Sequence, residues 1–104
     1  MEVKGGENNK CLVLLYEAIG TAVLVGALNI SGGKTEAIGI ALFMVILAFG
    51  PVSGAHINPA VTLAVFVKLR DFSNICFMLM IWAAQVVGAV GGLALAYSTS
   101  TWNL

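Results

Sequence analysis

A ten-residue stretch, Ser53 to Thr62 with the sequence SGAHINPAVT, places a polar Asn-Pro-Ala step between apolar segments. Pro59 suits the first position of a helix, where its missing N–H costs nothing, and Asn58 then takes the favoured N-cap position before Ala60. The free N–H groups and positive dipole end of such a helix can hold the oxygen of a small neutral molecule and repel a cation. The side-chain amide of Asn58 can donate to the same oxygen. This chemistry orients a molecule and makes or breaks no bond.

The loop before this helix carries the other groups that could contact a small molecule. Gly54 lets the loop extend so that its carbonyls face one way, and the carbonyls of Gly54, Ala55 and His56 would then form a row of acceptors. His56, the only histidine, is interpreted first as a loop-packing residue with a satisfied ring. Because no cysteine or second histidine is near it, we expect no metal site and no cofactor. Nucleophile–base pairs and phosphate-binding loops are absent from the sequence, which gives no support to an enzyme.

The composition is that of a membrane protein. Of the 104 residues, 60% are apolar and 10% are charged, and the mean hydropathy is +0.98, against about 45–50% apolar and about 25% charged residues in soluble domains. The formal net charge of zero gives no reason to expect a nucleic-acid partner. Cys11 and Cys76 are interpreted as small apolar residues rather than as a disulfide or metal ligands. Trp82 is interpreted as bulk that faces lipid or another protomer.

The apolar runs predict an all-α membrane protein with three transmembrane helices and one re-entrant half-helix. The half-helix, Pro59 to Val67, has about nine residues or about 13 Å of helix, whereas the hydrocarbon core is about 30 Å thick. It therefore enters and leaves from the same side, and its loop must be buried in protein or line a water-filled cavity. The expected segments are an N-terminal segment 1–10, spanning helices 11–30, 36–51 and 73–97, a re-entrant loop with its half-helix 52–67, and a tail 98–104.

The placement of lysine and arginine predicts the orientation. If two helices separate the N-terminal segment from the re-entrant segment, four basic residues lie on one side of the membrane and one lies on the other. The four are Lys4, Lys10, Lys68 and Arg70, and the one is Lys34. The positive-inside rule places the richer side in the cytoplasm. We therefore expect a cytoplasmic N-terminus and a C-terminal tail on the extracellular side.

The stretch SGAHINPAVT resembles the first signature loop of the aquaporin, or major intrinsic protein, family. Two further patterns agree in order and interval: Glu17-Ala-Ile-Gly20-Thr21 is similar to the family's first-helix pattern, and Gln85-Val-Val-Gly88-Ala89 to its third-helix pattern. The resemblance covers residues 11–97 and implies half of the family's inverted-repeat bundle. It also implies a channel in a lipid bilayer, with water or small neutral solutes as its substrates, and not an enzyme.

Four residues have expected roles, three of them implied by the resemblance and that of Gln85 by its buried amide, which needs partners. Glu17 would be a buried carboxylate that accepts hydrogen bonds from the re-entrant loop, the alternative being a hydrated charge near the interface. Gln85 would tie its helix to the loop, the alternative being a helix–helix hydrogen bond outside the pore. His56 would contribute its backbone to the pore and could turn its ring to the cytoplasmic vestibule. Ile38 would form one wall of the outer selectivity filter, unless it simply faces lipid.

The chain departs from the family pattern in two ways. It has one Asn-Pro-Ala step where the family has two, and it lacks the selectivity arginine, since Arg70 falls in a charged turn. Three hypotheses follow: the chain is a half-repeat from a longer parent that forms homotetramers; it is a non-conducting truncated subunit that associates with other channel chains; or two copies pair in opposite orientations, which Lys68 and Arg70 oppose. Without a second repeat, we expect Glu17, Asn58 and Gln85 to lack polar neighbours, so that the isolated chain folds poorly or oligomerises.

Overall fold

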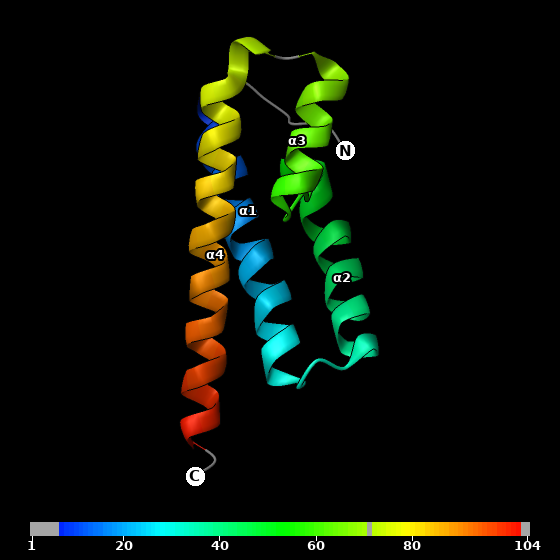
Figure 1. The fold of residues 1–104 in the computed structure, drawn as a ribbon, viewed down its shortest axis with the longest axis vertical. Coiled ribbons are helices and arrows are strands. Elements are labelled where there is room, and N and C mark those ends of the chain that lie inside the picture. The colour runs from blue at the N-terminus through cyan, green and yellow to red at the C-terminus, as the bar shows by residue number, and fades with distance from the viewer. Residues whose placement is uncertain (1–6, 71, 103–104) are drawn as a thin grey trace.

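The computed structural model describes residues 7–70 and 72–102 (Figure 1). The regular elements within these residues are all helices, joined by turns and loops. The helices are α1 (Glu7–Ile30), α2 (Thr35–Ser53), α3 (Pro59–Leu69), the short 3₁₀ helix η1 (Phe72–Asn74) and α4 (Ile75–Trp102). Together they form an elongated bundle with extents of 50 × 22 × 20 Å.

Three of the described helices are long and apolar enough to cross a membrane. The candidate spans are Asn9–Ile30, Thr35–Ser53 and Phe72–Thr99, with 22, 19 and 28 residues. The α3 helix has 11 residues, or about 16 Å, and is too short to cross a hydrocarbon core of about 30 Å. The predicted fold class, an all-α membrane protein with three spanning helices and one short helix, is confirmed.

The helices extend past the bounds expected from hydropathy. α2 runs through Pro51 to its end at Ser53, and α4 continues five residues beyond Tyr97. The polar residues at the expected end of α4 fit the helix because the hydroxyls of Ser98 and Thr99 donate to carbonyls of the preceding turn at 3.0 and 2.8 Å. Such bonds satisfy the hydroxyls without ending the helix. Parts of the expected N-terminal segment, charged turn and tail lie outside the described residues: 1–6, 71 and 103–104.

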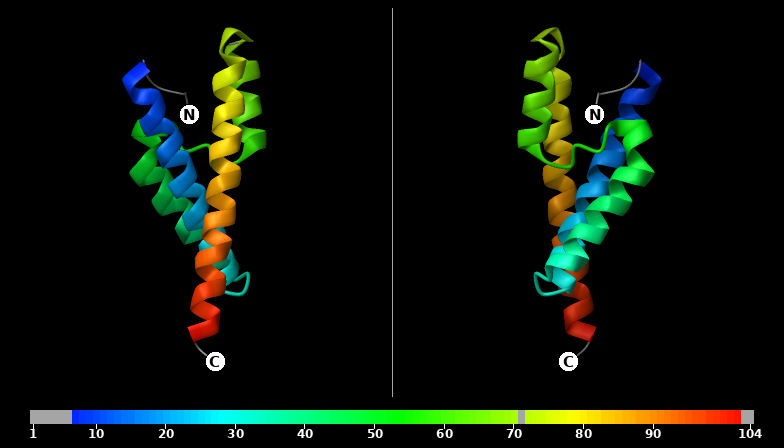
Figure 2. Two further views of the ribbon diagram at one scale, coloured as in Figure 1. Left: turned by 90° about the vertical axis from the view of Figure 1, so that its left-hand side faces the viewer. Right: turned by 90° about the vertical axis from the view of Figure 1, so that its right-hand side faces the viewer.

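α1 packs against both α2 and α4, and its contact with α4 is close enough to require glycine. A Cβ on Gly88 would lie 2.1 Å from the Ala18 carbonyl oxygen, and a Cβ on Gly92 would lie 2.4 Å from the Ala22 carbonyl oxygen. Small residues let helix backbones approach closely in a membrane, where packing rather than the hydrophobic effect holds helices together. Figure 2 shows α1 inclined to α4 and meeting it along the bundle.

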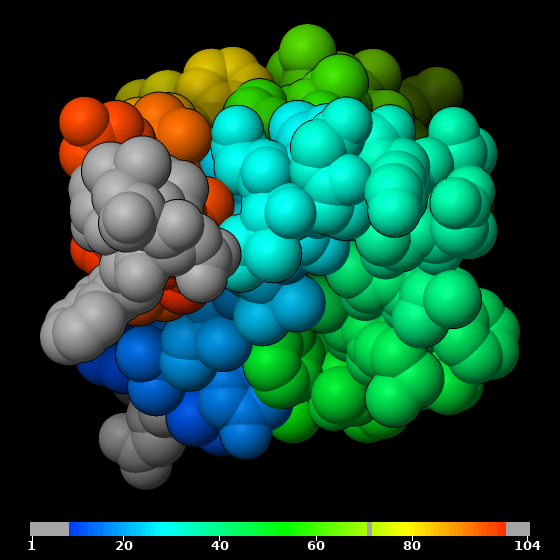
Figure 3. All heavy atoms as spheres, turned by 90° about the horizontal axis from the view of Figure 1, so that it is seen from below, coloured from blue at the N-terminus to red at the C-terminus, as the bar shows by residue number. Residues whose placement is uncertain are grey.

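α3 starts inside the bundle and rises to the end of the molecule at which α4 begins, so it does not cross the bundle (Figure 1 and Figure 2). α1 also starts at that end, whereas α4 finishes at the opposite end. Figure 3 views the molecule from this opposite end and shows the last part of α4 beside the α1–α2 turn. Phe66 of α3 belongs to a buried cluster with Val13 of α1 and with Phe77 and Ile81 of α4. A short helix that returns to this end has the arrangement that a re-entrant segment requires.

Candidate functional site

The first turn of α3 is capped by Asn58. The Asn58 backbone is extended, with φ −155° and ψ 124°, and its Oδ1 accepts a hydrogen bond from the Ala60 N–H at 2.8 Å. Pro59 occupies the first helical position, where its missing N–H leaves no donor unpaired. Asn58, Pro59 and Ala60 are all exposed, so the capped N-terminus of the half-helix is accessible from outside the chain.

Three of the four residues between α2 and Asn58 have a left-handed backbone: φ is +82° at Gly54, +48° at Ala55 and +43° at Ile57. Gly54 therefore ends α2, with its N–H bonded to a carbonyl of that helix at 2.9 Å, instead of extending the loop as predicted. For an L-residue this conformation costs about 1–2 kcal/mol, and it is least expected of a β-branched residue such as Ile57. The loop must therefore be held in shape by its surroundings.

Glu17 of α1 provides most of the contacts that hold the loop. Its side chain is 0% exposed, which does not fit the alternative of a hydrated charge near the interface. Oε1 accepts from the Ile57 N–H at 2.8 Å and from Gln85 Nε2 at 3.0 Å, and Oε2 accepts from the Ser53 hydroxyl at 2.8 Å and from the His56 N–H at 3.1 Å. A carboxylate has about four acceptor positions, so these donors fill it.

Gln85 of α4 and Thr62 of α3 extend this network. Gln85 Nε2 donates to Thr62 Oγ1 at 2.9 Å as well as to Glu17, and so joins α4 to both α3 and α1. His56 Nδ1 shares a hydrogen bond of 3.0 Å with the same Thr62 hydroxyl. The His56 side chain is 2% exposed, so its ring turns into the protein and not towards a vestibule, which corrects that possible role. Among the described residues, the buried atoms His56 Nε2 and Gln85 Oε1 have no hydrogen-bond partner.

Sequence reasoning missed Ser53 and Thr62 as members of this network, although both belong to the SGAHINPAVT stretch. Ser53 Oγ donates to Glu17 and accepts from the Ala55 N–H at 3.0 Å. A hydroxyl buried among apolar residues needs a partner, and that signal could have identified both residues. The expectation that Glu17 and Gln85 lack polar neighbours without a second repeat is wrong, because each is a partner of the other.

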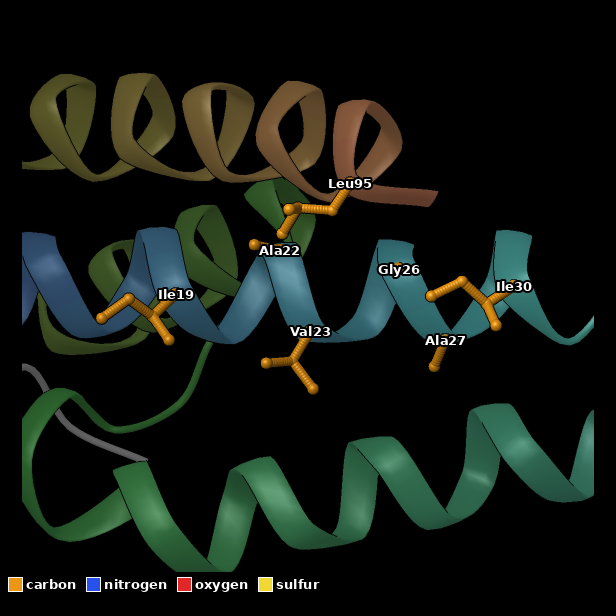
Figure 4. A pocket seen from close by; sticks show the side chains of 7 residues that line it. All are labelled: Ile19, Ala22, Val23, Gly26, Ala27, Ile30 and Leu95. Atoms are coloured by element: carbon orange, nitrogen blue, oxygen red, sulfur yellow. The ribbon is translucent and has the colours of Figure 1, made fainter. Parts of the chain in front are cut away.

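A hollow of about 240 Å³ lies against the loop. It is lined by the loop residues 55–58 with Val61 of α3, and by an apolar wall of Leu24 from α1 with Leu42 and Ile46 from α2. A larger hollow of about 400 Å³ between α1 and α4 is lined by apolar residues only and includes no loop residue (Figure 4). It offers no group that could orient a polar molecule, so the smaller hollow is the candidate site.

Ile38 lies near the start of α2, half-buried, and its N–H donates to the Lys34 carbonyl at 3.1 Å. It precedes Leu42 by four residues and Ile46 by eight, so it shares their side of the helix. It is not among the residues that line the hollow. The structure thus aligns Ile38 with the apolar wall but places it beyond the hollow, towards the α1–α2 turn.

The polar groups of the residues that line the hollow are the loop backbone, the Asn58 amide and the His56 imidazole. Within residues 7–70 and 72–102, no three His, Cys, Asp or Glu side chains gather as metal ligands, and Cys11 and Cys76 are free thiols at exposed positions. Groups of this kind can orient a neutral polar molecule by hydrogen bonding.

Several known proteins are similar to this chain in sequence. The family model described as major intrinsic protein matches residues 7–103. The lens fiber major intrinsic protein of Oryctolagus cuniculus is 46% identical over 66 residues, which cover 62% of this chain and 24% of that protein. Aquaporin-5 of Homo sapiens is 42% identical over 72 residues, which cover 64% of this chain and 24% of that protein. The aquaglyceroporin AqpS of Rhizobium meliloti strain 1021 is 38% identical over 96 residues, which cover 78% of this chain and 40% of that protein. The chain therefore spans 24% to 40% of the length of these relatives. No solved structure matches it significantly.

Proposed function

Since the chain belongs to the major intrinsic protein family and is an integral, multi-pass membrane protein, we propose that it forms one half of a channel for water or small neutral solutes. It would move its substrate without making or breaking a bond and is not proposed as an enzyme. The observation that carries the proposal is the hollow lined by the loop, by Asn58 at the capped N-terminus of α3 and by apolar side chains of α1 and α2.

The N–H groups and the carbonyls of the loop differ in their hydrogen bonding. The N–H groups of residues 55–57 are engaged by Ser53 and Glu17. Among the described residues, no hydrogen bond uses the carbonyls of residues 54–56. This division supports the proposal that the carbonyls of Gly54, Ala55 and His56 form a row of acceptors, which would replace part of the hydration shell of a passing molecule.

Asn58 adds a donor at the N-terminus of α3. Its Oδ1 is engaged by the Ala60 N–H, which leaves the Nδ2 amide to donate to a solute oxygen. The positive end of the helix dipole lies at the same place, where an oxygen is favoured and a cation disfavoured. The apolar wall of Leu24, Leu42 and Ile46 carries no charge that could offset this preference. We therefore propose neutral molecules as the substrate class.

The proposed channel lies in a lipid bilayer with the N-terminus of the chain in the cytoplasm. Lys10 near the start of α1, and Lys68 and Arg70 near the end of α3, belong to the same end of the bundle, whereas Lys34 belongs to the α1–α2 turn at the other end. The positive-inside rule supports this orientation. From the family resemblance, we also propose that complete pores assemble as homotetramers.

The hollow is lined only by the loop and by residues of α1, α2 and α3, so a pore at this place needs a further wall. We propose that a second half, in the same polypeptide or in another, closes the pore. The second candidate function, which the missing wall of the hollow also allows, is a non-conducting subunit that associates with other channel chains.

Solute flux in vesicles separates the two functions. Vesicles would carry the protein isolated with its associated chains, and light scattering after an osmotic step would report water and glycerol flux. We expect flux above that of empty vesicles, lowered by Asn58→Ala and unchanged by the matched control Asn29→Ala, an exposed asparagine in the last turn of α1. If folded protein never raises flux, and instead lowers the flux of a complete family channel in proportion to its amount, the non-conducting subunit replaces the channel as the function.

A further inference from the structure

We propose that Trp82 is a positioning residue whose indole N–H holds the Pro59 carbonyl and thereby fixes the first turn of α3, and with it Asn58, against α4. Its consequence for permeation rests on the channel function proposed above. The sequence alone suggested only bulk that faces lipid or another protomer, and the hydrogen bond to Pro59 corrects that interpretation.

The contact between the two residues is direct. Trp82 Nε1 donates to the Pro59 carbonyl oxygen at 3.1 Å, within the usual N–H···O range of about 2.7–3.2 Å. Pro59 follows Asn58 and begins α3, so this hydrogen bond acts one residue from the cap. The Trp82 side chain is only half-buried, so packing against the protein does not by itself fix the ring.

An indole N–H at the depth of Trp82 requires a partner from the protein. The span that includes α4 runs over Phe72–Thr99. Trp82 lies ten residues into this span, or about 15 Å by helical rise, which is half of a core of about 30 Å. Tryptophan is enriched at membrane interfaces, where water and headgroups can pair with its N–H. In the hydrocarbon region neither is available, and an unpaired donor is costly.

α3 turns one side towards α4, and Trp82 makes the contact nearest to the cap. Pro59, Thr62 and Phe66 are spaced by three and four residues and therefore share a side of the helix. Gln85 holds Thr62 through its amide, and Phe66 packs in the buried cluster towards the other end of α3. A helix of 11 residues is marginal by itself, so these contacts with α4 determine where its N-terminus points.

Carbonyl-labelled proline gives a direct test, because the chain has only two prolines, Pro51 and Pro59. The full chain, with ¹³C at its proline carbonyls and placed in lipid bilayers, would be compared by NMR with Trp82→Phe, which keeps an aromatic ring and removes the donor. Trp102→Phe is the matched control, the same change at the far end of α4. We expect Trp82→Phe to move the Pro59 resonance upfield and leave Pro51 in place, and the control to move neither. An unmoved Pro59 resonance, or equal shifts at both prolines, would overturn the proposal.

Two further measurements separate positioning from general stability. Hydrogen exchange of the α3 amides should quicken about fivefold in Trp82→Phe, as expected for the loss of one hydrogen bond of ordinary net strength. Exchange in α1 and α2 should stay unchanged, and a uniform increase would contradict a positioning role. In protein shown to conduct, Trp82→Phe should change the ratio of water to glycerol flux at equal amounts of folded protein, and an unchanged ratio would also overturn that role. Protein that conducts nothing refutes the channel function, while the carbonyl and exchange results still decide the contact between Trp82 and Pro59.

Discussion

Glu17→Ala should strongly lower the amount of folded protein. The substitution removes the acceptor of four donors, which are the Ser53 hydroxyl, the His56 N–H, the Ile57 N–H and the Gln85 amide. Two of these donors keep another acceptor, because the Ser53 hydroxyl also donates to a carbonyl of α2 at 3.3 Å and the Gln85 amide to a hydroxyl of α3 at 2.9 Å. The two backbone N–H groups of the loop keep no acceptor among the described residues.

The magnitude follows from those two N–H groups. A buried donor left without an acceptor costs about 1–3 kcal/mol, so the pair costs about 2–6 kcal/mol. The left-handed backbone of Ala55 and Ile57 stores about 1–2 kcal/mol each, and this strain favours loss of the loop conformation once its hydrogen bonds are gone. Native proteins are stable by about 5–15 kcal/mol, so losing these hydrogen bonds can leave most of the molecules unfolded.

Two measurements on detergent-solubilised protein test this prediction: the area of the folded peak in size-exclusion chromatography and the midpoint of thermal unfolding. Glu36→Ala is the matched control, because Glu36 is exposed in the first turn of α2 and should affect neither quantity. Glu17→Gln keeps one acceptor oxygen and should fall between the two variants. A normal yield and midpoint for Glu17→Ala would refute the reasoning that Glu17 holds the loop.

Three other substitutions have expected outcomes in the same two assays. Gly88→Ala should reduce the folded yield, because its Cβ would lie 2.1 Å from a carbonyl oxygen of α1, whereas Gly91→Ala, with no atom within 4 Å, should not; equal yields would contradict the close packing of α1 and α4. Thr62→Val keeps the shape of the side chain but removes a hydroxyl that contacts three groups, and should lower the free energy of unfolding by about 1–3 kcal/mol; an unchanged midpoint would show that the hydroxyl is dispensable. Gly54→Ala should cost about 1–2 kcal/mol at its left-handed φ. In contrast, Gly39→Ala, in a helix with open space around it, should be neutral or stabilising by up to about 1 kcal/mol; the reverse order would argue against the left-handed end of α2.

Much of the fold follows from hydropathy. Three long apolar runs and one short run after Pro59 predict three spanning helices and a half-helix, because backbone groups in lipid must pair within the chain. The Asn58 cap is also predictable, since an asparagine before a proline at a helix start depends on neighbouring residues alone. The end of α4 was less predictable, because Ser98 and Thr99 can either end a helix or bond back to it.

The network around the loop could not be derived from local chemistry. Glu17 and Gln85 are 68 residues apart in the sequence. A polar side chain within an apolar run indicates that each needs a partner, but no local rule identifies that partner. The left-handed φ of Ile57 opposes the preference of a β-branched residue, so a local rule predicts the wrong conformation. The role of Trp82 depends on a carbonyl in another helix, which neither its own neighbours nor its apolar surroundings indicate.

Whether the loop carbonyls face water tests the proposed pore most directly. His56 is the only histidine, so histidine labelled with ¹³C at its carbonyl reports a single position in the row. In lipid bilayers, solid-state NMR can measure how fast magnetisation passes from mobile water to that carbon. We predict transfer close in rate to that at the exposed turn of Gly32 and Gly33, because the row would face a water-filled path. Transfer as slow as at the lipid-facing carbonyls of the spanning helices would contradict a pore at this loop.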